Sequence, residues 1–123
     1  PLARIRSFAV SGCQPEIMGI GPVGSSKKAL ERAGITAADL DVIELNEAFA
    51  SQSLASIRDL GLDVTKINID GGALALGHPL GATGARITGK AAQILKRQSG
   101  RYALSTQCIG GGQGIATVLE SIS

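Results

Sequence analysis

The sequence contains few aromatic residues and few cysteines. Its aromatic residues are Phe8, Phe49 and Tyr102, and it has no tryptophan. So few rings argue against a protein that stacks on the bases of single-stranded nucleic acid. The two cysteines, Cys13 and Cys108, exclude a disulfide-dense secreted scaffold and a four-cysteine zinc site.

Strong charge of one sign and long apolar runs are also missing. The net charge is +2 at pH 7 and no basic run occurs, which argues against a surface that follows nucleic-acid phosphates. The longest uncharged stretch, residues 102–119, is interrupted by Ser, Thr, Gln and Gly, so we predict no membrane span. No signal-like segment is visible at the start, and we therefore expect a cytoplasmic protein.

Glycine is the residue type present in excess. It makes up 17 of the 123 residues, roughly twice the usual share of about 7%. A chain of this length that is 44% apolar and 18% charged is typical of a globular domain with a buried core. We expect one domain over residues 1–123.

The hydrophobic pattern predicts alternating strands and helices. Strands are expected at residues 3–10, 42–45, 67–69, 102–106 and 115–122. Helices are expected at residues 27–33, 47–60 and 85–98, with Ser25 or Ser26 as the N-cap of the first. This order predicts an α/β fold of three layers, with a five-stranded mixed and mostly parallel sheet, an antiparallel last strand and helices on both faces.

Asn46 lies where the second predicted strand gives way to a helix. An asparagine at this position is typical of a helix N-cap. Open α/β sheets also place their sites at the carboxyl ends of strands, so the Asn46 amide is equally placed to point into a cleft. The residue pattern leaves both interpretations open.

His78 is the only histidine, and it lies in a glycine-rich loop over residues 71–84. A lone histidine is often a surface residue. However, glycines that cost entropy on ordering are expected where the backbone must turn tightly or approach a ligand. Imidazole is also the side chain whose ordinary pKa lies near neutrality, so His78 is a candidate catalytic residue.

Cys108 begins the segment Cys108–Gly114, whose sequence is CIGGGQG. Cysteine is commonly a small buried hydrophobe. The three glycines from Gly110 favour a functional role, because their backbone N–H groups can face a ligand oxygen as in an oxyanion hole. With His78 as base and Asn46 as orienting residue, Cys108 also fits a Cys-His-Asn hydrolase.

The segment from Gly19 to Gly24 satisfies the pattern G-x-G-x-x-G. A dinucleotide-binding loop must follow its strand directly. Here Pro15 and other loop residues intervene, and Pro22 removes one N–H that would face a phosphate. We therefore do not expect this loop to bind a nucleotide.

Three ordered motifs resemble those of the thiolase family, the acetyl-CoA acetyltransferases and 3-ketoacyl-CoA thiolases. Residues 46–49 (NEAF) match one motif. Residues 71–86 (GGALALGHPLGATGAR) are similar to the glycine-rich histidine signature, with Leu74 for Ile and Thr83 for Ser. Residues 108–114 match the carboxyl-terminal active-site signature, and residues 18–22 (MGIGP) resemble a further loop of the family.

The resemblance implies a role for each of six residues. His78 would lower the pKa of the nucleophile and donate to the thioester oxygen, and Asn46 would hold a water beside it. Cys108 would be the acid/base at the α-carbon of the acetyl unit, and the Gly110 N–H would bind the acyl-enzyme oxygen. Met18 and Phe49 would line the pantetheine and acyl region. Related enzymes that act on carrier-protein thioesters have a second histidine at the position of Cys108, so Cys108 favours the thiolase branch.

The resemblance covers only the second half of a thiolase. The nucleophilic cysteine of the family lies in the first half, within C-x-S, which the surroundings of Cys13 do not match. We expect Cys13 to pack at the end of the first strand, and this chain by itself to be inactive. The resemblance implies an acyltransferase acting on acyl-CoA and coenzyme A, without metal or cofactor, as a homodimer or homotetramer. A non-catalytic module that binds coenzyme A or acyl lipid stays an alternative.

Overall fold

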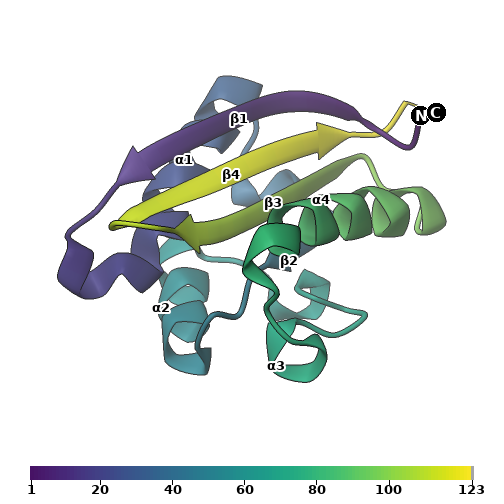
Figure 1. Cartoon of the computed structure of the whole chain (residues 1–123). Coiled ribbons are helices and arrows are strands. Elements are labelled where there is room, and N and C mark those ends of the chain that lie inside the picture. Colours follow the sequence, from purple (N-terminus) through teal and green to yellow (C-terminus); the bar gives the residue numbers. More distant parts are fainter. Residues whose placement is uncertain (123) are drawn as a thin grey trace.

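A four-stranded sheet forms the centre of the structure, a computed structural model that describes residues 1–122 (Figure 1). Its strands are β1 (Arg4–Gly12), β2 (Val42–Leu45), β3 (Tyr102–Ile109) and β4 (Gln113–Glu120). They lie in the order β1-β4-β3-β2. β4 is antiparallel to β1 and β3, whereas β2 and β3 are parallel. The prediction of a mixed sheet with an antiparallel last strand is therefore confirmed.

The prediction of a fifth strand at residues 67–69 is wrong. Only Ile67 reaches the sheet, through an isolated parallel bridge to Ile43. Asn68 adopts a φ of 47°, in the left-handed region that a strand cannot use. Its side chain accepts from Leu45 N at 3.0 Å and donates to Leu45 O at 2.8 Å. An amide side chain therefore fills the ladder position that a longer strand would have occupied.

Helices cover both faces of the sheet, as predicted. On one face α1 (Gly21–Ala33) packs its buried alanines and Leu30 against β1, β3 and β4, and α2 (Ala50–Leu60) lies beside it. On the other face α4 (Leu80–Arg97) buries Ile94 and Leu95 against β2 and β3. α1 and α4 thus lie on opposite sides of the sheet (Figure 1).

The first turns of α1 and α4 were predicted too late in the sequence. α1 begins at Gly21 with Pro22 in its first turn, where a missing N–H costs nothing. Ser25 and Ser26 are consequently buried inside the helix and are not N-caps. α4 begins at Leu80 rather than at residue 85. The remaining short helices are α3 (Ala73–Leu76), η1 (Pro15–Ile20), η2 (Ala37–Asp39) and η3 (Val64–Lys66).

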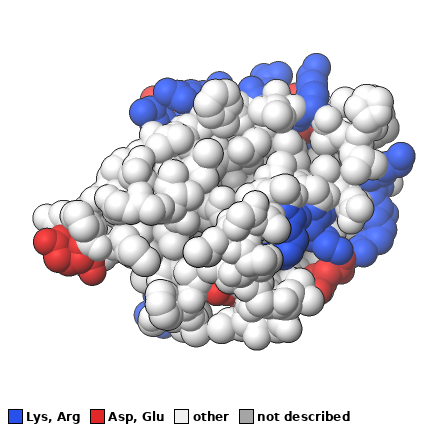
Figure 2. Space-filling view, viewed as in Figure 1, with Lys and Arg blue, Asp and Glu red and all other residues white. Residues whose placement is uncertain are grey.

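Part of the sheet on the α4 side is uncovered. Ile5, Phe8 and Val10 of β1 are 66%, 62% and 41% exposed, and Ile5 pairs with Leu119 of the α4-side core. Figure 2 shows Lys and Arg along the top of this view and on its right half, while a broad area left of the centre has no charged side chain. Within residues 1–122, none of the helices has the length and apolar character needed to cross a bilayer.

Candidate functional site

Asn46 follows β2 directly and is fully buried. Its backbone N donates to Thr106 O at 3.0 Å, which extends the pairing of β2 with β3. α2 begins only at Ala50, with Phe49 in the N-cap position, so the interpretation of Asn46 as an N-cap is wrong. Its Oδ1 atom is buried without a hydrogen-bond partner, and this leaves the amide available to the site.

His78 lies between α3 and α4, and both ring nitrogens have a polar neighbour. Nε2 lies 3.5 Å from Nδ2 of Asn46. Nδ1 lies 2.6 Å from Oγ1 of Thr83, which is 1% exposed in the first turn of α4. These two contacts orient an imidazole that is otherwise exposed.

Cys108 lies near the end of β3 and is half-buried. Burial raises the pKa of its thiol above the ordinary value, and the charge of Cys13 acts in the same direction. A cysteine with an ordinary pKa of about 8.5 is already mostly protonated at neutral pH. Cys108 is therefore a thiol there, able to give a proton to a carbon that carries negative charge.

Gly110 opens the turn that joins β3 to β4. Gly111 and Gly112 have φ values of 79° and 80°, a conformation that glycine adopts without a steric penalty. Gln113 Nε2 donates to Gly110 O at 2.8 Å across the turn. The glycine run that the sequence singled out therefore makes a braced, tight turn directly after Cys108.

A cavity of about 540 Å³ brings the candidate residues together. It is lined by Met18, Phe49, His78, Cys108 and Gly110, together with Ala48, Leu80, Gln107 and Ile109. Asn46 reaches the same place through its contact with His78. Cys13, which follows β1 and is partly exposed, is not among the residues that line this cavity.

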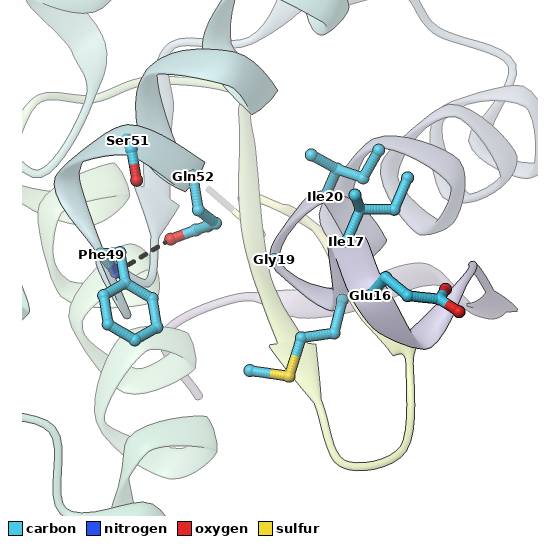
Figure 3. A pocket seen from close by; sticks show the side chains of 8 residues that line it. Glu16, Ile17, Gly19, Ile20, Phe49, Ser51 and Gln52 are labelled. Atoms are coloured by element: carbon cyan, nitrogen blue, oxygen red, sulfur yellow. Dashed lines mark hydrogen bonds between the residues drawn. The ribbon is translucent and has the colours of Figure 1, made fainter.

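A second cavity of about 410 Å³ shares Met18 and Phe49 with the first. Figure 3 shows Phe49 and Gln52 on one wall, from the start of α2, and Ile17 and Ile20 on the opposite wall, from η1. Gln52 Oε1 accepts from Phe49 N at 3.2 Å. Met18 and Phe49 thus line both cavities, and His78 and Cys108 line the larger one.

Glu47 and Asn68 were not predicted to matter, and both support the site. Glu47 Oε1 accepts from Leu74 N at 3.2 Å, and a Cβ at Gly72 would collide with its carboxylate. Glu47, which directly follows Asn46, therefore ties the segment after β2 to the loop that carries His78. Asn68 bonds to the last residue of β2. The double glycine at residues 71–72 was the feature of the sequence that could have indicated the contact with Glu47, because it marks a place of close approach.

Glu44 and Arg86 form a buried pair between β2 and α4. Glu44 is fully buried, and its Oε2 lies 3.9 Å from Arg86 Nη1. Neither carboxylate oxygen has a hydrogen-bond partner. Burial raises the pKa of Glu44 to about 7, although the charges of Arg86 and Lys90 act in the opposite direction.

The two remaining sequence features concern metal and nucleotide binding. Over residues 1–122, no three His, Cys, Asp or Glu side chains gather closely enough to hold a metal ion, and the expectation that no metal is needed stays a prediction. The segment Gly19–Gly24 forms the end of η1 and the start of α1. A Cβ at Gly21 would collide with the backbone of Gln113, so this part of the loop packs against β4.

The chain matches the family model for the thiolase C-terminal domain over residues 1–121. It is 55% identical over 121 residues to the human mitochondrial 3-ketoacyl-CoA thiolase, a match that covers 98% of this chain and 30% of the human protein. It is 59% identical over 122 residues to the beta-ketothiolase BktB of Cupriavidus necator, covering 99% of this chain and 31% of that relative.

The fold agrees with a solved structure of the same human protein. The crystal structure of human mitochondrial 3-ketoacyl-CoA thiolase in complex with CoA superposes with a TM-score of 0.98 at 54% identity. The match covers all of this chain and 31% of that one. The chain thus spans about a third of the length of the relatives it matches.

Proposed function

The chain belongs to the thiolase family as a C-terminal domain, and we propose that it supplies half of the catalytic site of an acyltransferase. The reaction transfers an acyl group between coenzyme A and the α-carbon of acetyl-CoA, as thiolytic cleavage of a 3-ketoacyl-CoA or as the reverse condensation. The observation that carries this proposal is that His78 and Cys108 line one cavity and that Asn46 contacts the His78 ring. Because Cys13 does not line that cavity, the nucleophilic cysteine comes from a part of the polypeptide outside this chain.

His78 first takes a proton from the nucleophile and then donates a hydrogen bond to the thioester oxygen. Its Nε2 atom takes the proton of the nucleophilic thiol, which leaves a thiolate to attack the 3-keto carbon. The protonated Nε2 then donates to the thioester oxygen of the acetyl-CoA unit as the bond between C2 and C3 breaks. The cavity of about 540 Å³ beside His78, with a second one of about 410 Å³ that shares Met18 and Phe49, supports a long thioester substrate at this position.

Asn46, through a water, and Gly110, through its N–H, would stabilise the two oxygens that gain charge. The buried Asn46 Oδ1 has no protein partner, and a buried acceptor of this kind is commonly satisfied by an ordered water. That water would give a second hydrogen bond to the thioester oxygen beside Nε2 of His78. Gly110, at the tight turn, would direct its N–H at the oxygen of the acyl-enzyme. Each donor of this type typically contributes about 10²–10³ in rate.

Cys108 moves the proton at the α-carbon. In the cleavage direction the C2–C3 electron pair stays on the acetyl-CoA unit as an enolate, and the Cys108 thiol gives its proton to C2. His78 returns its proton to the Cys108 thiolate and then takes the proton of the thiol of an incoming coenzyme A. The coenzyme A sulfur attacks the acyl-enzyme and releases the nucleophilic cysteine, which recovers its proton from His78. The raised pKa of Cys108 supports this assignment, because a protonated thiol is the form that cleavage requires.

Met18 and Phe49 stand where the two cavities meet, and we assign them to the pantetheine and acyl chain of the substrate. One structural relative is in complex with CoA, which supports acyl-CoA and coenzyme A as ligands. We propose that no further cofactor takes part and that the complete enzyme is a homodimer or homotetramer. A cytoplasmic location stays a prediction, since one relative is named as mitochondrial.

Acylation by acetyl-CoA tests the proposal most simply. The full polypeptide that carries this chain is incubated with acetyl-CoA, and mass spectrometry locates the acetyl group. We expect it on a cysteine outside this chain. A label on Cys108 would indicate the Cys-His-Asn hydrolase, and binding of acetyl-CoA without any label would indicate the non-catalytic module.

His78→Ala tests the catalytic assignment in the same polypeptide. Loss of the base and of one oxyanion donor is expected to lower kcat for acetoacetyl-CoA cleavage by at least about 10²–10³. Gln93→Ala, an exposed change on α4, is the control and should retain full activity. Wild-type cleavage by His78→Ala would contradict the role given to His78.

A further inference from the structure

We propose that Thr83 is a positioning residue that holds neutral His78 in the tautomer with its proton on Nδ1. The inference deepens the proposed function and rests on it for its catalytic meaning. Thr83 lies in the first turn of α4, with a relative exposure of 1%. Its Oγ1 atom has two polar neighbours, the His78 ring and the carbonyl of Pro79.

The contacts of Thr83 indicate which atom donates. A hydroxyl has one proton to give, and Thr83 Oγ1 donates it to Pro79 O at 3.0 Å. Such a bond to the carbonyl four residues earlier is a common arrangement for threonine in a helix. The same Oγ1 lies 2.6 Å from Nδ1 of His78. With its own proton directed to the carbonyl, Oγ1 accepts, and Nδ1 must carry the hydrogen.

The contact on the opposite side of the ring, at Nε2, independently indicates the same tautomer. Nε2 of His78 faces Nδ2 of Asn46 at 3.5 Å, the outer limit for a hydrogen bond. An amide nitrogen only donates, so Nε2 is the acceptor of this contact and has no hydrogen in the neutral ring. Thr83 and Asn46 thus select one tautomer from two directions.

This tautomer is the one that the proposed reaction needs. A bare Nε2 can take the proton of the nucleophilic thiol and then donate it toward the thioester oxygen. A ring with hydrogen already on Nε2 cannot accept there, and it would leave the nucleophile as an unreactive thiol. Fixing the tautomer therefore decides whether the first proton transfer takes place.

The tautomer can be read without any substrate. The full polypeptide is labelled with ¹⁵N-histidine, and solid-state NMR at about pH 8.5, above the ordinary histidine pKa, distinguishes protonated from bare ring nitrogens. His78 is assigned by the signals that disappear in His78→Gln. We expect a protonated Nδ1 and a bare Nε2 in the wild type and in Thr83→Ser, which keeps the hydroxyl. Thr83→Val should raise the share of the other tautomer.

Thr88→Val is the matched control on the same helix. Thr88 Oγ1 bonds to Ser105 Oγ at 3.0 Å, so this variant loses a comparable hydroxyl contact without touching His78. Thr83→Val should lower kcat for acetoacetyl-CoA cleavage about tenfold, in the range of one hydrogen bond, with KM nearly unchanged. Thr83→Ser and Thr88→Val should retain wild-type kcat and the wild-type tautomer.

The outcomes separate this inference from the proposed function. A wild-type spectrum with the hydrogen on Nε2 would overturn the role of Thr83, even if Thr83→Val did not fold. An unchanged tautomer in a folded Thr83→Val would overturn it as well. A polypeptide with hydrogen on Nδ1 but no acyl transfer would instead contradict the proposed function and leave the assignment of Thr83 standing.

Discussion

Two acidic side chains of this chain have a pKa raised by burial, and the consequences differ. For Cys108 the shift keeps a proton on the thiol that lines the cavity. Glu44 pairs with Arg86 of α4 and is not among the residues that line the cavity. Its carboxylate has lost its water and has gained only a long ion pair with Arg86. Such a group makes folding depend on pH.

The Glu44→Gln variant tests this dependence. The folded pKa of Glu44, about 7, lies above its ordinary value of 4.5, so the folded state prefers the protonated form. Stability is therefore full below about pH 4.5 and falls as the pH rises through 7. A difference of about 2.5 pKa units corresponds to roughly 3 kcal/mol.

Urea unfolding between pH 4.5 and 8 measures this difference. The free energy of unfolding of the wild type should fall over this range by roughly 3 kcal/mol more than that of Glu44→Gln. The control is Glu16→Gln, a change at an exposed carboxyl, which should follow the wild type. Parallel curves for Glu44→Gln and the wild type would show that Glu44 is not a buried group of this kind.

At the scale of elements, the start of β4 and the start of α1 approach each other at two glycines. A Cβ at Gly114 would collide with the backbone of Gly21, and a Cβ at Gly21 would collide with Gln113. Backbone atoms cannot move aside as the end of a long side chain can. η1, which precedes α1, contacts β3 and β4, and its residue Met18 lines the same cavity as Cys108.

Gly114→Ala should consequently destabilise the fold by roughly 1–3 kcal/mol, as overpacking of a tight site does. Gly89→Ala is the matched control, because Gly89 is an exposed position inside α4 with no atom within 4 Å of its Cβ position. In a helix interior this change should stabilise by roughly 0.5–1 kcal/mol. Urea unfolding of the three proteins measures both effects, and a neutral Gly114→Ala would contradict the close approach.

The sequence was sufficient to predict most elements but not their first turns. Periodicity located β2, β3 and the apolar faces of the helices, because these depend on local pattern. It failed where a residue acts through a distant contact. Pro22 was taken as a loop residue although it lies in the first turn of α1, which begins at Gly21. Asn68 was placed in a strand, whereas its side chain binds the backbone of Leu45.

The same distinction holds for the site. His78, Cys108 and Asn46 were predicted because they lie in recognisable motifs. The fold brings His78 and Cys108 to one cavity and places Asn46 against His78. The supporting contacts of Thr83 and Glu47 were not predicted. Thr83 lies only five residues from His78, and its contact with the ring depends on how the loop enters α4. Glu47 bonds to Leu74, which is 27 residues away, so only the folded geometry reveals that contact.

At the scale of the whole molecule, the chain corresponds to about a third of its relatives. Family members that it matches continue well beyond it, and β1 carries exposed apolar side chains. The residues described here supply an amide, an imidazole and a thiol, whereas the nucleophile is assigned to the remainder. We therefore expect acyl transfer only from the complete polypeptide.

The most direct test of the account is deuterium exchange at the α-carbon of acetyl-CoA, catalysed in D₂O by the complete polypeptide and followed by NMR. Our assignment requires Cys108 for this exchange but not for acetylation of the nucleophile. Cys108→Ala should lose exchange by at least about 10² while it still transfers the acetyl group between coenzyme A molecules. Exchange at the wild-type rate in Cys108→Ala would contradict the proposal that Cys108 is the acid/base of the site.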